Sequence, residues 1–197
     1  MDYLKQELIL ASASPRRKEL LEQVGIKFSI IPSNVDESKL ELNGDPHEKT
    51  IASALIKAKD VAGRLEKGLI LGADTIVVLD GKIYGKPVNI QHSYEMLKSL
   101  SGKCHQVITG VALVDASTGI YLTGHEKTDV YFSFIDDDEI MAYINSGESV
   151  GKAGAYAIQG KGALFVEKID GCYSNVVGLP ISLLKKMLKN ICKKEEF

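Results

Sequence analysis

The sequence predicts an α/β protein with a mixed β-sheet flanked by helices. Short apolar runs typical of buried strands alternate along the chain with stretches of helical periodicity. Two hairpin signals, Asp80–Gly81 and the segment 117–119, indicate antiparallel strand pairs within that alternation. Because a purely parallel sheet has no such hairpins, the pattern favours a mixed sheet.

The first elements are a strand, a tight turn and a helix in immediate succession. Leu8–Ala11 is a short apolar run, and Ser14 and Pro15 suit the N-cap and the first position of a helix that Gly25 would end. A second strand is expected at 28–31. The next helix begins at Asp45, whose capping box is completed by Glu48.

The spacing of apolar residues predicts which face of that second helix is buried. The positions expected to face the core are Ile51, Leu55, Ala58, Ala62 and Leu65. Lys57 and Lys59 fall outside this stripe and are expected on the polar side.

Further elements follow to the end of the chain. A strand over 69–79 is expected to be interrupted at 72–75 and to return through a hairpin at Ile83–Tyr84. The remaining expectations are a helix at 90–100, two long strands within 107–134, a helix at 137–145, a strand at 163–169 and an amphipathic helix after Pro180.

Composition limits the function classes. The chain has 197 residues, a formal net charge of −2 and three cysteines without metal-ligand spacing. This argues against a general nucleic-acid binder and favours reduced thiols in a cytoplasmic protein. No signal peptide or membrane span is expected, and since no linker stands out, residues 1–197 are treated as a single domain.

The turn after the first strand has the composition of an anion site. Ser12, Ser14, Arg16 and Arg17 lie around a predicted helix N-terminus, where backbone N–H groups and the helix dipole favour phosphate. A capped surface helix with solvated arginines is an equally good interpretation of this spacing alone.

Acidic side chains form a second group of candidates. Asp74 interrupts an apolar strand, which is costly unless the carboxylate is paired, metal-bound or at a cleft, and Lys86 follows the next hairpin. A hydrogen-bonded structural Asp in a β-bulge is the alternative. Asp36 and Glu37 follow a strand and could ligate Mg²⁺, although acids in loops are usually only solvated.

The segment Lys152–Gly160 (KAGAYAIQG) is rich in small residues that would let a ligand approach the backbone. Its Gln159 could recognise a base through its amide, but a plain turn-rich connection is the alternative. The four histidines show no catalytic pattern, and surface or helix-start positions are expected for them.

Together these segments resemble the Maf family of nucleoside triphosphate pyrophosphatases over nearly the whole chain. The resemblance is carried by LILASASPRRKELL at 8–21, VDE at 35–37, GADT at 72–75, GKP at 85–87, KAGAYAIQG at 152–160 and VGLP at 177–180. It implies an elongated, Ham1-like or ITPase-like α/β fold with two lobes around a cleft. It also implies a homodimer.

Three positions distinguish the types within the family. This chain has Arg16, Thr75 and Gln159 there, the combination of the dTTP/UTP pyrophosphatase type. The resemblance implies Asp74 as general base, with Glu37 and Asp74 holding Mg²⁺ or Mn²⁺. Substrate would be bound by Ser12, Ser14, Arg16, Arg17, Lys57, Thr75, Lys86, Lys152 and Gln159.

Two other functions stay open at this stage. The family was named for inhibition of septum formation, so a nucleotide-binding regulator of cell division with little catalysis is one alternative. An enzyme that also accepts CTP or modified pyrimidine nucleotides is the other. A purely structural role would leave Asp74 and the clustered cations unexplained.

Overall fold

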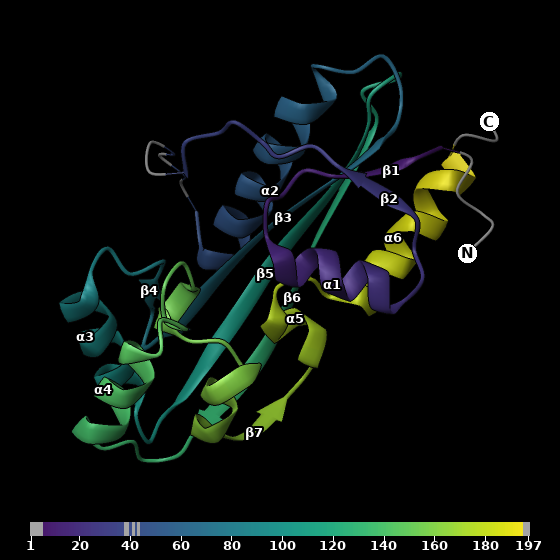
Figure 1. The fold of residues 1–197 in the computed structure, drawn as a ribbon. Helices are drawn as coiled ribbons and strands as arrows, with labels where there is room; N and C mark the ends of the chain where they lie inside the picture. Colours follow the sequence, from purple (N-terminus) through teal and green to yellow (C-terminus); the bar gives the residue numbers. More distant parts are fainter. Residues whose placement is uncertain (1–5, 38–39, 41, 43, 195–197) are drawn as a thin grey trace. The chain divides into compact units, whose positions relative to one another are not determined.

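The computed structural model describes residues 6–37, 40, 42 and 44–194. Within this part of the chain the sheet has seven strands in the order β2-β1-β3-β5-β6-β7, with β4 paired to β3. β1 pairs in parallel with β2 and β3, whereas the β3–β4 and β6–β7 pairs are antiparallel. The expected mixed sheet with flanking helices is therefore confirmed (Figure 1).

Most of the expected elements are present. The strands are β1 Leu8–Leu10, β2 Phe28–Ile30, β3 Leu69–Leu79, β4 Lys82–Tyr84, β5 Cys104–Asp115, β6 Tyr121–Phe132 and β7 Val166–Asp170. The α-helices are α1 Pro15–Gln23, α2 Pro46–Ala62, α3 Ile90–Leu100, α4 Asp137–Asn145, α5 Tyr173–Val177 and α6 Ile181–Lys194. Two 3₁₀ helices, η2 Ala153–Ala155 and η3 Gly160–Phe165, precede β7.

The chain divides into two compact units. The first comprises residues 1–74, 109–126 and 178–197, and the second comprises residues 75–108 and 127–177. The division falls within β3, β5 and β6.

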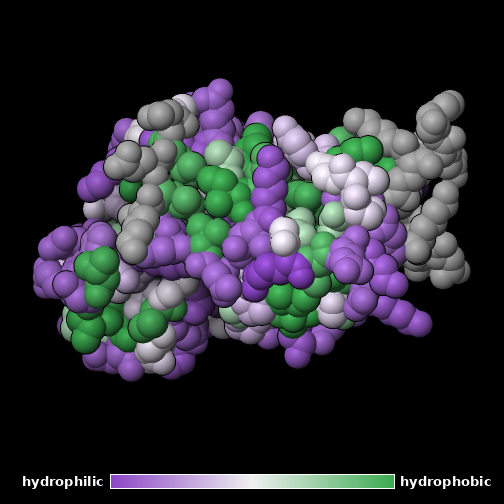
Figure 2. Space-filling model, turned by 90° about the horizontal axis from the view of Figure 1, so that it is seen from above, coloured by the Kyte–Doolittle hydropathy of each residue, from purple (hydrophilic) through white to green (hydrophobic). Residues whose placement is uncertain are grey.

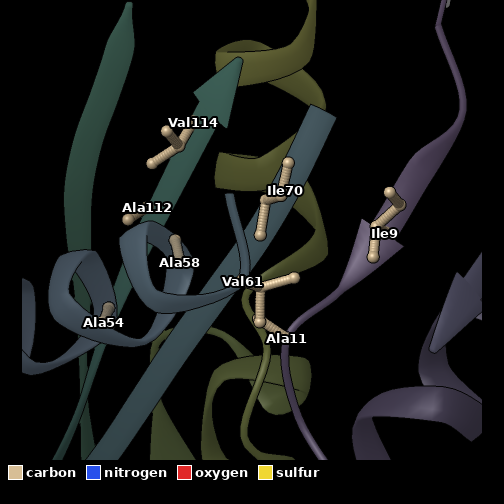
Figure 3. Close-up of a cluster of buried hydrophobic side chains, with 8 residues drawn as sticks. All are labelled: Ile9, Ala11, Ala54, Ala58, Val61, Ile70, Ala112 and Val114. Atoms are coloured by element: carbon tan, nitrogen blue, oxygen red, sulfur yellow. The ribbon is translucent and has the colours of Figure 1, made fainter. Parts of the chain in front are cut away.

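The first unit has a core between α2 and the sheet. Side chains of β1, the residue after it, α2, β3 and β5 form it, namely Ile9, Ala11, Ala54, Ala58, Val61, Ile70, Ala112 and Val114 (Figure 3). Alternate strand residues such as Leu8 and Leu10 are also fully buried, because α6 lies on the opposite side of these strands from α2. β1 and the first part of β3 are therefore covered on both faces.

Small residues bring α2 unusually close to the sheet. A Cβ added at Gly72 would lie 2.2 Å from the backbone oxygen of Ala54, and one at Gly110 would lie 2.3 Å from the backbone of Thr50. Only glycine permits such an approach at these two positions. β3 runs without a break from Leu69 to Leu79, so the expected interruption at 72–75 is wrong. Gly72 instead marks the place where α2 packs closely on the strand.

The buried face of α2 agrees with the prediction only in part: Ala58 is buried as expected, while Leu55, Ala62 and Leu65 pack against the edge of the core. Thr50, Ser53, Ala54, Lys57, Ala58 and Val61 are buried, whereas Ile51, Leu55 and Ala62 are only half-buried. Close packing favours small side chains at the centre of the contact and leaves the larger ones at its margin. Lys57, expected on the polar side, is only 5% exposed.

The second unit contains an aromatic cluster. Phe132 makes ring contacts with His105, Tyr156 and Phe165, and Phe165 also contacts Tyr143. His105 is 1% exposed, so the surface or helix-start position expected for it is wrong. No periodicity signals its burial, because its partners come from distant segments.

Local details also differ from expectation. The segment expected to be a strand at 163–169 is a 3₁₀ helix up to Phe165 and a strand only from Val166. Ser14 does lie at the N-cap of α1, but its side chain makes no capping hydrogen bond. The short helix α5 was not predicted, since five residues carry too little periodicity.

Apolar side chains also reach the surface between hydrophilic ones (Figure 2). In the second unit Val88, Phe134 and Leu164 are each more than three-quarters exposed. Within the described part of the chain, none of the helices combines the length and the hydropathy that crossing a bilayer requires.

Candidate active site

A buried lysine joins two acidic side chains at the centre of the candidate site. The Nζ of Lys57 lies 2.6 Å from Oδ1 of Asp74 and 2.8 Å from Oε1 of Glu37. Lys57 comes from α2, Asp74 from β3 and Glu37 from the segment between β2 and α2. Burial makes an unpaired ammonium costly, and the two carboxylates offset that cost.

The two carboxylates converge because they share this cation. Their contacting oxygens are at most about 5.4 Å apart, the sum of the two distances of 2.6 and 2.8 Å to the same nitrogen. The side chain of Asp74 is 20% exposed and that of Glu37 is 43% exposed. Both carboxylates therefore keep access to solvent and hence to a ligand.

Arg17 lies in the same electrostatic environment. Its Nε donates to the carbonyl of Gly178 at 2.9 Å, and its Nη1 donates to Oγ of Ser12 at 3.1 Å. Burial lowers the pKa of Arg17 from its ordinary value; the charges of Asp74 and Glu37 oppose this effect, and that of Arg16 adds to it. Arg17 stays cationic over the working range of pH because the ordinary pKa of an arginine is so high.

The turn before α1 has the geometry of an anion site. Ser12 Oγ accepts from Arg17 and from the backbone N–H of Ser14 at 3.2 Å, which fixes the turn. Pro15 occupies the first turn of α1, and Arg16 and Arg17 follow it directly. The positive end of the helix dipole and the guanidinium group of Arg17 therefore coincide at this terminus.

Two of the predicted site residues of the second unit, Lys86 and Lys152, lie on segments that contact each other. The backbone N–H of Gly154 donates to the carbonyl of Gly85 at 3.0 Å, which joins the segment of Lys86 to the segment of Lys152. Lys86 is exposed and Lys152 is half-buried, with its Nζ donating to the carbonyl of Val150 at 3.0 Å. Thr75 directly follows Asp74 in β3.

Gln159 is half-buried on a segment that side chains of the second unit hold in place. The hydroxyl of Tyr143 accepts from the N–H of Ala157 at 3.1 Å, and a ring nitrogen of His105, Nε2, lies 2.7 Å from the hydroxyl of Tyr156. Burial lowers the pKa of His105 from 6.5 to about 4, so this ring is neutral near pH 7. The segment is thereby tied to a rigid aromatic cluster.

The structure thus brings the predicted residues together in two groups. Within the first unit Ser12 and Arg17 are in direct contact, as are Glu37, Lys57 and Asp74, and electrostatics link the two sets. Within the second unit the segments of Lys86 and Lys152 are joined. Sequence reasoning missed Gly178, whose carbonyl binds Arg17, although it lies in the VGLP motif.

The donor set of the first unit fits a small hard cation. Mg²⁺ is typically held by one or two carboxylates and completes its octahedron with water and substrate phosphates. Glu37 and Asp74 supply two such carboxylates on converging side chains. In the described residues no cluster of three or more His, Cys, Asp or Glu side chains could hold a metal without further ligands.

Comparison with known proteins identifies the family. A family model described as Maf-like protein matches residues 7–191. The chain belongs to the Maf family. That match includes every predicted site residue, all of the second unit and most of the first.

Relatives of high similarity share one name. A protein of Ruminiclostridium cellulolyticum named dTTP/UTP pyrophosphatase is 54% identical over 189 residues, covering 96% of this Maf chain and 98% of that protein. One of Pelotomaculum thermopropionicum with the same name is 47% identical, covering 93% and 96%. A solved HAM1 protein from Coxiella burnetii shares the fold, with 17% identity, a TM-score of 0.53 and coverage of 94% and 99%.

Proposed function

We propose that this protein hydrolyses dTTP and UTP to the nucleoside monophosphate and pyrophosphate. The observation that carries the proposal is the Glu37–Lys57–Asp74 cluster beside Arg17, in a chain whose Maf relatives are named dTTP/UTP pyrophosphatases. Such a cluster combines a proton acceptor with cations, which is what phosphoryl transfer from a triphosphate requires.

Asp74 is the proposed general base. Lys57 holds one oxygen of its carboxylate, Oδ1, and the other oxygen, Oδ2, can accept a proton from the attacking water. The water oxygen forms a bond to phosphorus, and the anhydride linkage between the α- and β-phosphates breaks to release pyrophosphate. Lys57 fixes the orientation of the base, since its ammonium is itself anchored by Glu37.

Cationic groups bind the triphosphate in this proposal. Arg16, Arg17 and the backbone N–H groups after Ser14 would hold phosphate oxygens at the N-terminus of α1, with Ser12 orienting Arg17. Lys57, Lys86 and Lys152 would add positive charge. Thr75 and Gln159 would select the pyrimidine through hydrogen bonds.

A divalent cation completes the proposed site. Glu37 and Asp74 would hold Mg²⁺ or Mn²⁺, which supplies charge neutralisation at the phosphates and makes a coordinated water more acidic.

The test compares the wild type with two Asp→Asn variants. Each protein is incubated with a panel of canonical nucleoside triphosphates and Mg²⁺ or Mn²⁺, and products are resolved chromatographically. Asp74→Asn should lower kcat by at least about a hundredfold, as expected for loss of a general base, with a much smaller change in nucleotide affinity. Asp138→Asn, at an exposed position on α4, is the matched control and should be unchanged.

Each outcome has a distinct meaning. Monophosphate and pyrophosphate from dTTP and UTP, lost only in Asp74→Asn, would support both the reaction and its base. Turnover of CTP or modified pyrimidine nucleotides would indicate an enzyme with a broader substrate range. Tight nucleotide binding without product would refute the proposed catalytic activity and favour a nucleotide-binding regulator of septum formation.

We further propose that the protein acts in the cytoplasm as a homodimer, without nucleic acid or membrane as partners. The net charge of −2 gives no general attraction to nucleic acid, and exposed apolar residues such as Val88, Phe134 and Leu164 suit contact with a second copy. Light scattering coupled to size-exclusion chromatography tests the dimer, and a monomer mass across micromolar concentrations would refute it.

A further inference from the structure

Helix α2 and the turn just after it carry two more charged residues on the side of Lys57. Asp60 and Arg64 follow Lys57 at three and seven residues, a spacing that places all three along one side of a helical path. Arg64 lies just past the C-terminus of α2, and its Nη2 lies 3.1 Å from Oδ2 of Asp60. The side chain of Arg64 is 38% exposed and that of Asp60 is 27% exposed, so the ion pair by itself contributes little stability.

The contacts of this pair converge on one short segment, Pro32–Val35. Oδ2 of Asp60 accepts from the N–H of Asn34 at 2.9 Å and from the hydroxyl of Ser33 at 3.0 Å. Nη2 of Arg64 donates to the carbonyl of Pro32 at 2.9 Å. Ser33 Oγ in turn accepts from the N–H of Val35 at 3.2 Å. Every residue of the segment is thus bound directly or through one intermediate.

The pKa of Asp60 agrees with this arrangement. It is lowered from its ordinary value, chiefly by the hydrogen bond from the backbone of Asn34, with further contributions from Ser33 and Arg64 against the effect of burial. The carboxylate is therefore ionised at neutral pH, which strengthens each of these hydrogen bonds.

The segment leads directly to Glu37. Two residues after Val35, Glu37 reaches Lys57, which lies one helical turn before Asp60. Helix α2 therefore presents the lysine and also fixes the backbone from which the partner carboxylate extends. Since Glu37 is 43% exposed and has a flexible side chain, its 2.8 Å contact depends on a fixed starting point in the backbone.

We propose that Asp60 and Arg64 are positioning residues that hold Glu37 at the active site by clamping Pro32–Val35 to α2. This inference rests on the proposed function for its effect on catalysis. Removal of a group that supports a ligand carboxylate, without touching the ligand itself, commonly lowers activity or metal affinity by about ten- to a hundredfold.

A double-mutant cycle tests the proposal. Asp60→Asn keeps the shape of the side chain but loses its charge, and Glu37→Gln removes the carboxylate that Asp60 is proposed to position. Asp60→Asn should lower kcat/KM for dTTP by about tenfold or more. In the Glu37→Gln background the same substitution should have no further effect, because its target is already absent.

Controls separate positioning from loss of folding. Glu22→Gln removes an exposed i,i+4 pair with Lys18 on α1 and should leave kcat/KM unchanged. Far-UV circular dichroism and thermal melting establish that each variant is folded. If Asp60→Asn does not fold, Ser33→Ala removes one link of the clamp, with a smaller loss that should again vanish in the Glu37→Gln background.

The free energy of urea unfolding, measured for the same four proteins, tests the positioning role without relying on turnover. Glu37→Gln should destabilise the wild type more than it destabilises Asp60→Asn, since the Glu37–Lys57 contact depends on the clamp. Additive losses in both cycles, or an unchanged kcat/KM in Asp60→Asn, would overturn the proposal. A wild type inactive on every nucleotide would count against the proposed function, while the unfolding cycle would still decide the positioning role.

Discussion

Acidification should destabilise the second unit through His105. Its ring is 1% exposed, and burial lowers its pKa from 6.5 to about 4. One ring nitrogen, Nε2, lies 2.7 Å from the hydroxyl of Tyr156, while Nδ1 has no hydrogen-bond partner among the described residues. Protonation would therefore place a charge and an unsatisfied N–H group in an aromatic cluster.

The sign and size of the effect follow from linkage. The unfolded state takes up the proton near pH 6.5 and the folded state only near pH 4, so stability is lost as pH falls through this window. At about 1.4 kcal/mol per pKa unit, the full loss is about 3 kcal/mol, and about 2 kcal/mol of it is reached by roughly pH 5. Above about pH 7.5 both states are neutral and the contribution of His105 no longer changes with pH.

The assay compares the wild type with His105→Gln, a neutral side chain that can still hydrogen-bond Tyr156. Urea unfolding is followed by tyrosine fluorescence, since the chain has eight tyrosines and no tryptophan. The free energy of unfolding of the variant should be lower at pH 7.5 but should fall less on acidification, by about 2 kcal/mol at pH 5. Other groups that titrate cancel in this difference.

Two results would refute this reasoning. The first is an equal decline of both proteins between pH 7.5 and pH 5. The second is an imidazole resonance of His105 that titrates near pH 6.5 in the folded protein, because a ring that accepts a proton so readily is not enclosed as described.

Two further predictions concern α2 and its lysine. Gly72→Ala should lower the free energy of unfolding by about 1–3 kcal/mol, and should lower turnover as well, because its Cβ would lie 2.2 Å from the carbonyl oxygen of Ala54 and displace the helix. Urea unfolding and the nucleotide assay check this; Gly63→Ala, where φ is −65° and an added Cβ would meet its nearest atom at 3.4 Å, separates packing from loss of glycine as such. Lys57→Met should abolish most turnover and cost about 1–3 kcal/mol of stability, since two converging carboxylates lose their cation. Unchanged stability would show that solvent alone satisfies them.

Local sequence signals predicted the elements that depend on contiguous residues. Both capping boxes, Asp45 with Glu48 and Asp136 with Glu139, are present, although only the first was predicted. The hairpin at Asp80–Gly81 has positive φ at both residues, as its sequence requires. These features form because every interacting group lies within a few residues along the chain.

The sequence by itself determined the order of most strands and helices and the family motifs, and it pointed to Ser12–Arg17 as a candidate anion site, which stays a prediction. Only the tertiary structure decided that Lys57 is buried, that β3 is continuous past Gly72, and that Asp60 supports the segment of Glu37. The physical reason is the same in each case. A lysine in an amphipathic helix is expected at the surface, and it becomes buried only where carboxylates from segments 17 and 20 residues away offset its desolvation.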